Sequence, residues 1–327
     1  MQTDLDRLAA QLGSWRWMLL VAAALDSGIV RALGAGPLGP DDLAGQLGLE
    51  PRATCVVAEA LVEGGFLQGA DGRWGLTGPA RRLLLDETDP AYTAPSVLHG
   101  RDLAARWLNL PEILKGQRPA TRPASGPGTF TATMALGART AAPVAVAACL
   151  AHFPGTRRVL DVGGGPGVYA RAFLDQGLAV TIFDLPPVIE LVRPQWAGVT
   201  EATLAAGDFT AGLPAGPFDL ALLGNVCHIY GPDENRRLFK RVAAALAPGG
   251  GVAIIDFVRG RSPMAALFGV NMLSGGGTGG TWTEAEYRAW LAEAGFAEIQ
   301  VEDTGATPEE ISIHQRQLVF ATLPAHS

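Results

Sequence analysis

The sequence has few cysteines, and none of them is placed to bind a metal ion or to build a disulfide framework. Cys55, Cys149 and Cys227 are the only three in 327 residues. Their number is odd and their spacing matches no set of metal ligands. We therefore expect reduced thiols in a cytoplasmic protein that holds no metal.

Long apolar runs and an excess of basic residues are also missing. No segment approaches the ~20 uninterrupted apolar residues that a membrane helix requires. The stretch WRWMLLVAAALDSGIV (15–30) is interrupted by Asp26 and has the wrong flanks for a signal peptide. The formal net charge of −7 argues against a general nucleic-acid-binding protein. We expect neither a membrane nor a nucleic acid as a partner.

The length predicts more than one domain, and residues 1–95 are typical of a winged helix. A pair of long apolar helices is expected within 5–33. The stretches PDDLAGQLGL (40–49) and RATCVVAEALVEGG (52–65) predict a helix-turn-helix. Two short strands around Ala-Asp-Gly follow in FLQGADGRWGLT (66–77), which indicates a hairpin.

A winged helix would suggest DNA binding, but the charges of this domain oppose it. Up to Asp89 the chain has twelve acidic and seven basic residues, a net charge of −5. The expected recognition helix carries Glu59 and Glu63, which would repel phosphates. The first apolar helices have more hydrophobic surface than one chain could easily cover. We therefore predict a homodimer, whose interface contains Trp15, Trp17, Leu20 and Val21.

The rest of the chain divides into a connector and a sheet domain. Residues 96–155 predict a helical connector, broken by the Pro/Gly-rich loop RPATRPASGPG (118–128). From 156 to 327 short β-branched runs alternate with amphipathic helices, which predicts an α/β fold with a doubly wound, mostly parallel, Rossmann-like sheet. The last two strands, in 297–305 and 316–323, have only a short link, so we expect them to form an antiparallel hairpin at one edge.

The segment VLDVGGGPGVYARAF (159–173) reads as a strand, a glycine turn and a helix start, an arrangement typical of nucleotide binding. The dinucleotide pattern GxGxxG fails here, because it needs glycine where Pro166 or Val168 stands. The residues present are Asp161, Gly163, Gly165 and Gly167 at alternating positions. This spacing suits a sulfonium amino acid and does not build a cradle for a pyrophosphate.

Two more acidic residues follow the next two expected strands. Asp184 stands where a carboxylate can hold both ribose hydroxyls, and Asp208 with Phe209 could meet an adenine amino group and ring face. Three such positions at successive strand ends predict S-adenosylmethionine as the cofactor. Leu185 and Asn225, also at strand ends, are expected as further contacts.

At this point the chain resembles the plant-type and bacterial small-molecule O-methyltransferases, in which a winged-helix dimerisation domain precedes a class I methyltransferase domain. The resemblance covers nearly the whole length. It is carried by LAGQLGLEPRATCVVAEALVEGGFL, GTFTATMALGA, DVGGGPG, IFDLP, GDF, CHIYGPDENRRLF, LAPGGGVAIIDF and GGTWTEAEYRAWLAEAGF.

The resemblance implies a general base and a residue that holds it. His228 occupies the place after the fourth strand where relatives carry the base for a substrate hydroxyl, and Asp256 stands at the end of the fifth strand, where an acid holds that histidine. A histidine just past a strand end would lie where such sheets bind ligands, and imidazole suits proton removal from a phenol or acid. The resemblance also implies cofactor contacts for the glycines, Asp184, Asp208 and Phe209.

Three departures from the family pattern bear on the acceptor atom. Relatives often read His-Asp-Trp where this chain has His228-Ile229-Tyr230, and plant members carry lysine where Gly224 stands. A second acid of relatives is absent, because GGTWT offers Thr281 and Trp282. O-methylation is favoured, while C-, N- or S-methylation, a non-methylating enzyme of the same fold and a SAM-binding winged-helix regulator remain alternatives.

The acceptor pocket is expected between the connector and the sheet. Phe130 and Met134 lie one helical turn apart, and Asn271 and Met272 precede the glycine-rich SGGGTGG (274–280), which could be a mobile lid. Trp107 is a further candidate. The methionines could equally be core filling. Apolar and aromatic candidates favour a flat, ring-containing natural-product intermediate as the substrate.

Overall fold

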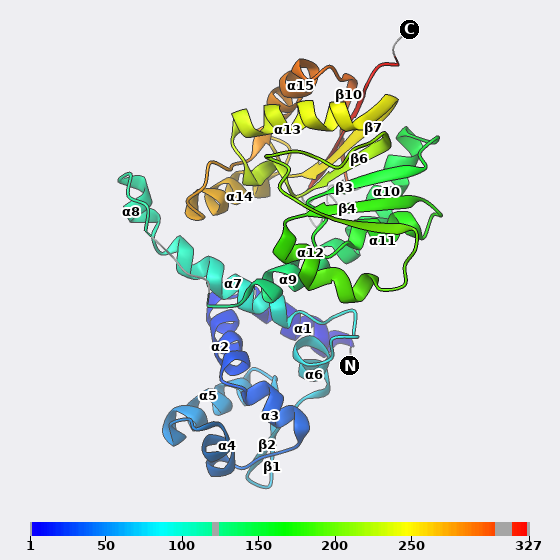
Figure 1. Cartoon of the computed structure of the whole chain (residues 1–327). Helices are drawn as coiled ribbons and strands as arrows, with labels where there is room; N and C mark the ends of the chain where they lie inside the picture. Colours follow the sequence, from blue (N-terminus) through cyan, green and yellow to red (C-terminus); the bar gives the residue numbers. More distant parts are fainter. Residues whose placement is uncertain (1, 120–123, 305–315, 326–327) are drawn as a thin grey trace. The chain divides into compact units, whose positions relative to one another are not determined.

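The computed structural model describes residues 2–119, 124–304 and 316–325, and it divides into two compact units. The first contains Met1–Ala105 and Thr121–Leu136, and the second contains Arg106–Ala120 and Gly137–Ser327. The predicted connector is therefore shared between the units. The two are described one after the other and can be followed along the colour bar of Figure 1.

The apolar segment at the start of the first unit forms three helices, so the prediction of a pair was wrong. They are α1 (Gln2–Leu12), α2 (Trp15–Asp26) and α3 (Ile29–Ala35). The second break is at Gly28, which has φ 83°, a left-handed conformation that a helix cannot contain. Val21 is buried in the core of this unit, which corrects its assignment to a dimer interface.

The two helices and the hairpin predicted for the winged helix are present in the first unit. Helices α4 (Pro40–Leu47) and α5 (Pro51–Glu63) precede the antiparallel strands β1 (Leu67–Ala70) and β2 (Arg73–Leu76). Asp71 and Gly72 connect the strands with φ of 52° and 69°, the two positive values that a tight hairpin turn requires. Helix α6 (Gly78–Leu84) follows.

Four helices occupy the predicted connector: α7 (Ala94–Trp107), α8 (Leu110–Leu114), α9 (Pro127–Arg139) and α10 (Ala141–His152). The sequence predicted a loop over 118–128, of which residues 120–123 lie outside the described part of the chain. Helix α9 begins within the predicted loop, at Pro127, because proline fits the first turn of a helix without losing a hydrogen bond.

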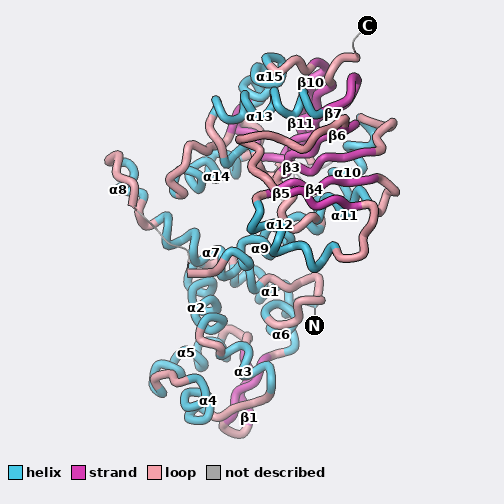
Figure 2. Tube along the Cα trace, viewed as in Figure 1, coloured by secondary structure: helices cyan, strands magenta, loops and turns pink. Residues whose placement is uncertain are grey.

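The second unit contains a seven-stranded sheet with the order β10-β11-β7-β6-β3-β4-β5 (Figures 1 and 2). Strands β7, β6, β3, β4 and β5 are parallel to one another, and β11 runs antiparallel to both of its neighbours, β7 and β10. This confirms the predicted α/β fold and the antiparallel final pair. The strands are β3 (Arg158–Val162), β4 (Ala179–Asp184), β5 (Ala202–Ala206), β6 (Phe218–Gly224), β7 (Leu246–Asp256), β10 (Ala297–Asp303) and β11 (Gln317–Thr322).

Helices cover both faces of this sheet, because its strands are apolar on both sides. One core packs α10, α11 (Val168–Leu174) and α12 (Pro186–Val192) against the strands, and the other packs α13 (Pro232–Ala245) and α15 (Glu284–Glu293) on the opposite face. The remaining elements are the short helices η1 (Arg193–Trp196) and η2 (Cys227–Ile229), the strands β8 (Val258–Arg259) and β9 (Trp282–Thr283), and helix α14 (Pro263–Ser274).

No single helix in the described ranges is both long and apolar enough to cross a membrane. Two helix pairs reach that length and composition only together, and each is bent: Asp4–Leu12 with Trp15–Asp26 by 97°, and Gly128–Arg139 with Ala141–His152 by 60°.

Candidate active site

The candidate site lies at the edge of the sheet where the parallel strands end. The register places the ends of β3, β4, β5, β6 and β7 at one edge, and each strand ends in, or shortly before, a residue predicted to act there. The first residues of β11 reach the same edge, since Gln317 pairs with Asp256 in the antiparallel register. Ligands bind at this edge in sheets of this kind.

The glycine turn after β3 needs its glycines for conformation and for space. Gly163, Gly165 and Gly167 have φ of 67°, 50° and 72°, values that residues with a side chain rarely adopt. A Cβ at Gly163 would lie 2.7 Å from the Val226 side chain. The N–H of Gly163 donates to the carbonyl of Phe183 at 2.7 Å, so the turn is fixed to the neighbouring strand.

Two carboxyl groups support this turn. Asp161 is buried, its Oδ2 has no hydrogen-bond partner among the described residues, and burial together with the negative charge of Asp184 raises its pKa to about 7. Asp184 accepts the N–H of Gly165 at 2.8 Å and that of Leu185 at 2.7 Å. Burial raises the pKa of the Asp184 carboxyl, and these two N–H donors act in the opposite direction.

The other predicted cofactor residues lie at the same edge. Asp208 accepts both the N–H and the hydroxyl of Thr210 at 2.7 Å, which lowers the pKa of the Asp208 carboxyl. The Phe209 ring meets the Tyr230 ring edge to face at 4.8 Å. Leu185 is exposed and directly precedes α12. The contacts of these residues with a cofactor stay predictions.

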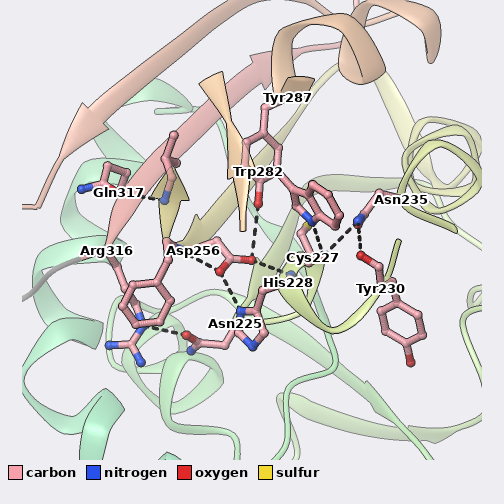
Figure 3. A network of polar contacts seen from close by, with 12 residues as sticks. Asn225, Cys227, His228, Tyr230, Asn235, Asp256, Trp282, Tyr287, Arg316 and Gln317 are labelled. Carbon is pink, nitrogen blue, oxygen red and sulfur yellow. Dashed lines mark hydrogen bonds and ion pairs between the residues drawn. The ribbon is translucent and has the colours of Figure 1, made fainter. Parts of the chain in front are cut away.

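His228 and Asp256 form a buried pair, as Figure 3 shows. His228 Nδ1 lies 2.7 Å from Asp256 Oδ1, and the main-chain N–H of His228 donates to Asp256 Oδ2 at 3.0 Å. The same carboxyl accepts the N–H of Phe257 at 2.8 Å and, at 3.4 Å, the hydroxyl of Tyr287. Since a carboxylate only accepts hydrogen bonds, this arrangement fixes the proton of His228 on Nδ1 and leaves Nε2 with a free lone pair.

The turn that carries His228 is held by one side chain from the following helix and one from a distant part of the sequence. Asn235 Nδ2 donates to the carbonyls of Cys227, Tyr230 and Gly231 at 2.9–3.1 Å. Trp282 Nε1 donates to the Cys227 carbonyl at 2.9 Å. The Cys227 thiol is buried, and burial raises its pKa well above the usual range, which agrees with a packed rather than a reactive cysteine.

The glycine stretch 274–280 is attached to the His228 turn. Thr278 accepts the N–H of Gly231 at 3.1 Å, and the N–H of Gly280 donates to the His228 carbonyl at 2.9 Å. A Cβ at Gly279 would collide with the carbonyls of His228 and Ile229. These contacts argue against a lid that is free along its whole length, because its second half is fixed to the site.

The residues predicted for the acceptor pocket fall in both units. Trp107 Nε1 donates to Asn271 Oδ1 at 3.4 Å, so these two candidates meet in the second unit, and Met272 follows on the same helix. Phe130 and Met134 lie on α9 in the first unit, where the exposed Phe130 ring meets the edge of His99 at 5.6 Å. The role of all five at an acceptor stays a prediction.

Sequence reasoning missed several residues that build the site. Tyr287 contacts Asp256 of the His228–Asp256 pair, and Asn235 holds the turn of His228. The rings of Phe257 and Phe268 stack at 4.1 Å, and Phe268 meets the His228 ring edge to face at 4.8 Å. Arg316 donates through Nε to Asn225 Oδ1 at 2.6 Å. Only Phe257, directly after Asp256, had a nearby signal, because these contacts depend on how α14, α15 and β11 pack.

The comparisons with known proteins agree with this geometry. The model of the O-methyltransferase domain family matches residues 129–297. A 3-hydroxy-5-methyl-1-naphthoate 3-O-methyltransferase from Streptomyces sahachiroi is 31% identical over 314 residues, which are 88% of this chain and 88% of that protein. The chain belongs to the O-methyltransferase family. It is an S-adenosylmethionine-dependent O-methyltransferase, as the family resemblance implied. The cofactor is the one that the glycine turn and the strand-end acids predicted.

Solved structures show the same fold for this O-methyltransferase. PigF with S-adenosylhomocysteine is 21% identical, has a TM-score of 0.76 and aligns over 97% of this chain and 98% of its own. Human N-acetylserotonin methyltransferase in complex with S-adenosylmethionine is 22% identical, has a TM-score of 0.74 and aligns over 94% of each chain. The likeness confirms the class I methyltransferase sheet.

The residues of this chain fit the cofactor. The left-handed glycines let a ligand approach the backbone closely, and the half-buried Asp184 carboxylate keeps lone pairs for hydroxyl donors beside the two N–H groups it accepts. The unpaired Oδ2 of Asp161 puts a buried acid directly behind the turn, where a cationic ligand would favour its ionised form.

Proposed function

We propose that this enzyme methylates a hydroxyl group of a small aromatic natural-product intermediate, with His228 as the general base. The observation that carries the proposal is the buried His228–Asp256 pair, in which one carboxyl holds both the ring and the main chain of the histidine. A base held in this way keeps one tautomer and one orientation, so Nε2 can take a proton when the acceptor hydroxyl reaches it.

The aromatic residues beside the histidine support an aromatic acceptor. Phe257 and Phe268 are stacked, and Phe268 contacts the His228 ring, so a flat ring can pack next to the base. The relative from Streptomyces sahachiroi acts on a hydroxylated naphthoate, and a relative from Streptomyces lavendulae acts in mitomycin biosynthesis. Both names agree with a ring-containing natural product as the acceptor.

S-adenosylmethionine, when bound, supplies the methyl group. Asp161, Gly163, Gly165, Gly167 and Asp184 would hold it beside β3 and β4, and Asp208, Phe209, Leu185 and Asn225 would complete the contacts. The work of the chain in the reaction is positioning, which brings the acceptor oxygen into line with the methyl group, and removal of the hydroxyl proton by His228. Asp256 stabilises the charged ring that results.

The missing second acid does not leave the histidine unsupported. Thr281, at the position of that acid, is buried, and Asp256 already accepts both the ring N–H and the main-chain N–H of His228. Tyr287 adds a further donor to Asp256, and burial beside Asp256 raises the pKa of the Tyr287 hydroxyl well above its usual range, so it stays protonated. One acid therefore suffices to orient the base.

The test of the proposal is His228→Ala. The methylation rate should fall by roughly 10²–10⁴, the usual contribution of a positioned acid–base group. Affinity for S-adenosylhomocysteine, measured by calorimetry, should stay nearly unchanged, because the predicted cofactor contacts other than Asn225 lie on or just after β3, β4 and β5, whereas His228 follows β6. Product mass after incubation with hydroxylated naphthalenes identifies the acceptor. Retention of most of the activity in the variant would refute the role of His228 as the base.

We also propose a homodimer formed through α2. Trp15 is 60% exposed and Leu19 is 36% exposed, and they lie one turn apart on that helix. Trp17 is less available, because its ring packs against Phe66 at 5.9 Å within the same unit. An exposed apolar pair on a helix is typical of a surface that a second chain covers.

A further inference from the structure

Arg316 is a cation that lies beside the aromatic residues of the site, Phe257 and Phe268. It directly precedes β11, and the register Gln317–Asp256 brings it to the edge where β6 and β7 end. Its side chain is half-buried. Figure 3 shows its guanidinium beside the Asn225 side chain, which in this view stands between Arg316 and the ring of His228.

Two contacts hold the guanidinium in place. Nε donates to Asn225 Oδ1 at 2.6 Å, and the guanidinium carbon lies 4.7 Å from the centre of the Phe257 ring. Asn225 is itself fixed, with φ 58° and a main-chain N–H that donates to the Ile255 carbonyl at 2.9 Å. The guanidinium is therefore preorganised by groups that also border the candidate site.

A continuous aromatic surface joins this cation to the base. Phe257 carries the guanidinium on its face and stacks on Phe268, whose ring meets His228 edge to face. A flat ring that packs against this surface would have the base near one end and Arg316 near the other. The arginine ion pairs among the described residues do not include Arg316. Its Nε is the nitrogen that donates to Asn225 Oδ1.

We propose that Arg316 binds a carboxylate at this edge of the sheet, and that this carboxylate belongs to the aromatic acceptor. A guanidinium with its terminal nitrogens available binds a carboxylate through two parallel hydrogen bonds. The inference rests on the proposed function for the aromatic nature of the acceptor and adds its charge. The other source of the same chemistry is the carboxylate of the cofactor's amino acid part.

Binding measurements separate the two sources without relying on turnover. Arg316→Met removes the charge, Arg316→Gln keeps one donor for Asn225, and Arg237→Met is the control, because Arg237 pairs with Glu234 on α13. The acceptor arm compares a hydroxynaphthoic acid with the naphthol that lacks its carboxyl, each added to enzyme saturated with S-adenosylhomocysteine. The cofactor arm compares S-adenosylhomocysteine with 5′-methylthioadenosine, which lacks the amino acid part.

The expected result is weaker binding of the hydroxynaphthoic acid alone. Arg316→Met should weaken binding of the hydroxynaphthoic acid by about 10- to 100-fold. Binding of the naphthol and of both adenosine ligands should stay nearly unchanged. A selective loss for S-adenosylhomocysteine over 5′-methylthioadenosine would assign the same anchor to the cofactor carboxylate. The proposal would be overturned if Arg316→Met weakened each carboxylic acid and its counterpart without the carboxylate equally, or if it weakened the binding of neither. The His228→Ala variant should still bind the hydroxynaphthoic acid. The binding test of Arg316 therefore stays valid even if His228 is not the base.

Discussion

At the scale of single residues, Asp161 shows how a residue of a cofactor site can lower the folding stability of the cofactor-free protein. Its carboxyl is buried under the glycine turn, has one oxygen without a partner, and lies near the negative charge of Asp184. Burial and that charge raise its pKa from 3.8 to about 7. An acid whose pKa is raised on folding destabilises the folded chain at every pH where the unfolded chain has lost the proton.

The sign of this effect gives a prediction for stability against pH. Below about pH 4 the carboxyl is neutral in both states and has no effect, and the penalty grows up to about pH 7. This rise in the pKa of Asp161, from 3.8 to about 7, corresponds to a loss of folding stability of at most about 4 kcal/mol. Without cofactor, Asp161→Asn should therefore gain stability over the parent protein as the pH rises from 4 to 7, as measured by urea unfolding.

The control for this prediction is Asp175→Asn, which changes an exposed carboxyl at the end of α11. Its free energy of unfolding should follow the parent protein across the same pH range. If Asp161→Asn also follows the parent protein, the carboxyl is not a source of pH-dependent destabilisation in the empty site.

At the scale of elements, the glycine stretch after α14 is part of the support of the base. Its second half bonds to the turn of His228 through Thr278 and Gly280. Gly279 lies against the carbonyls of His228 and Ile229, which leaves no room for a Cβ. A change in this stretch should therefore reach the base through the backbone.

Gly279→Ala tests this coupling. The backbone must shift to admit a methyl group, which we expect to cost about 1–3 kcal/mol of stability and to lower kcat by displacing His228. Gly277→Ala is the matched control, because a Cβ there meets only the N atom of Gly279 at 3.9 Å, an ordinary contact. Thermal unfolding and initial rates of both variants are compared. Equal rates for the two variants would show that the stretch does not position the base.

The sequence predicted the elements whose pattern is local. Buried β-branched runs that end in Asp184 or Asp256, and a glycine turn after Asp161, can be recognised without knowledge of the fold. The pairing of His228 with Asp256 was implied by the family resemblance, and the structure contains it. The sequence did not predict Tyr287, Asn235 and Arg316 as site residues. Each reaches the site through the packing of its helix or strand, and no local sequence pattern indicates where that element packs. The break at Gly28 was missed for a different reason: one glycine in an apolar run predicts a weak helix as readily as a turn.

At the scale of the whole molecule, the exposed face of α2 is the proposed dimer interface. Trp15→Glu should give monomers by light scattering at micromolar concentration, because a carboxylate in the centre of an apolar interface remains without a partner. Val56→Glu, which changes an exposed apolar residue on α5, is the control and should leave the oligomeric state of the parent protein unchanged. A parent protein that is already a monomer would contradict the dimer itself.

The position of β11 has a consequence for the order in which the enzyme is made. This strand is the last of the sheet in sequence, yet it lies between β10 and β7 and brings Gln317 to Asp256. Synthesis proceeds from the N-terminus, so the glycine turn and the His228 turn leave the ribosome before the strand that completes their edge of the sheet. A chain interrupted before β11 would leave β7 unpaired on one side, with its backbone N–H and C=O groups open to pairing with other chains. Premature termination near the end of the coding sequence should therefore produce an aggregating, inactive protein instead of a weakened enzyme.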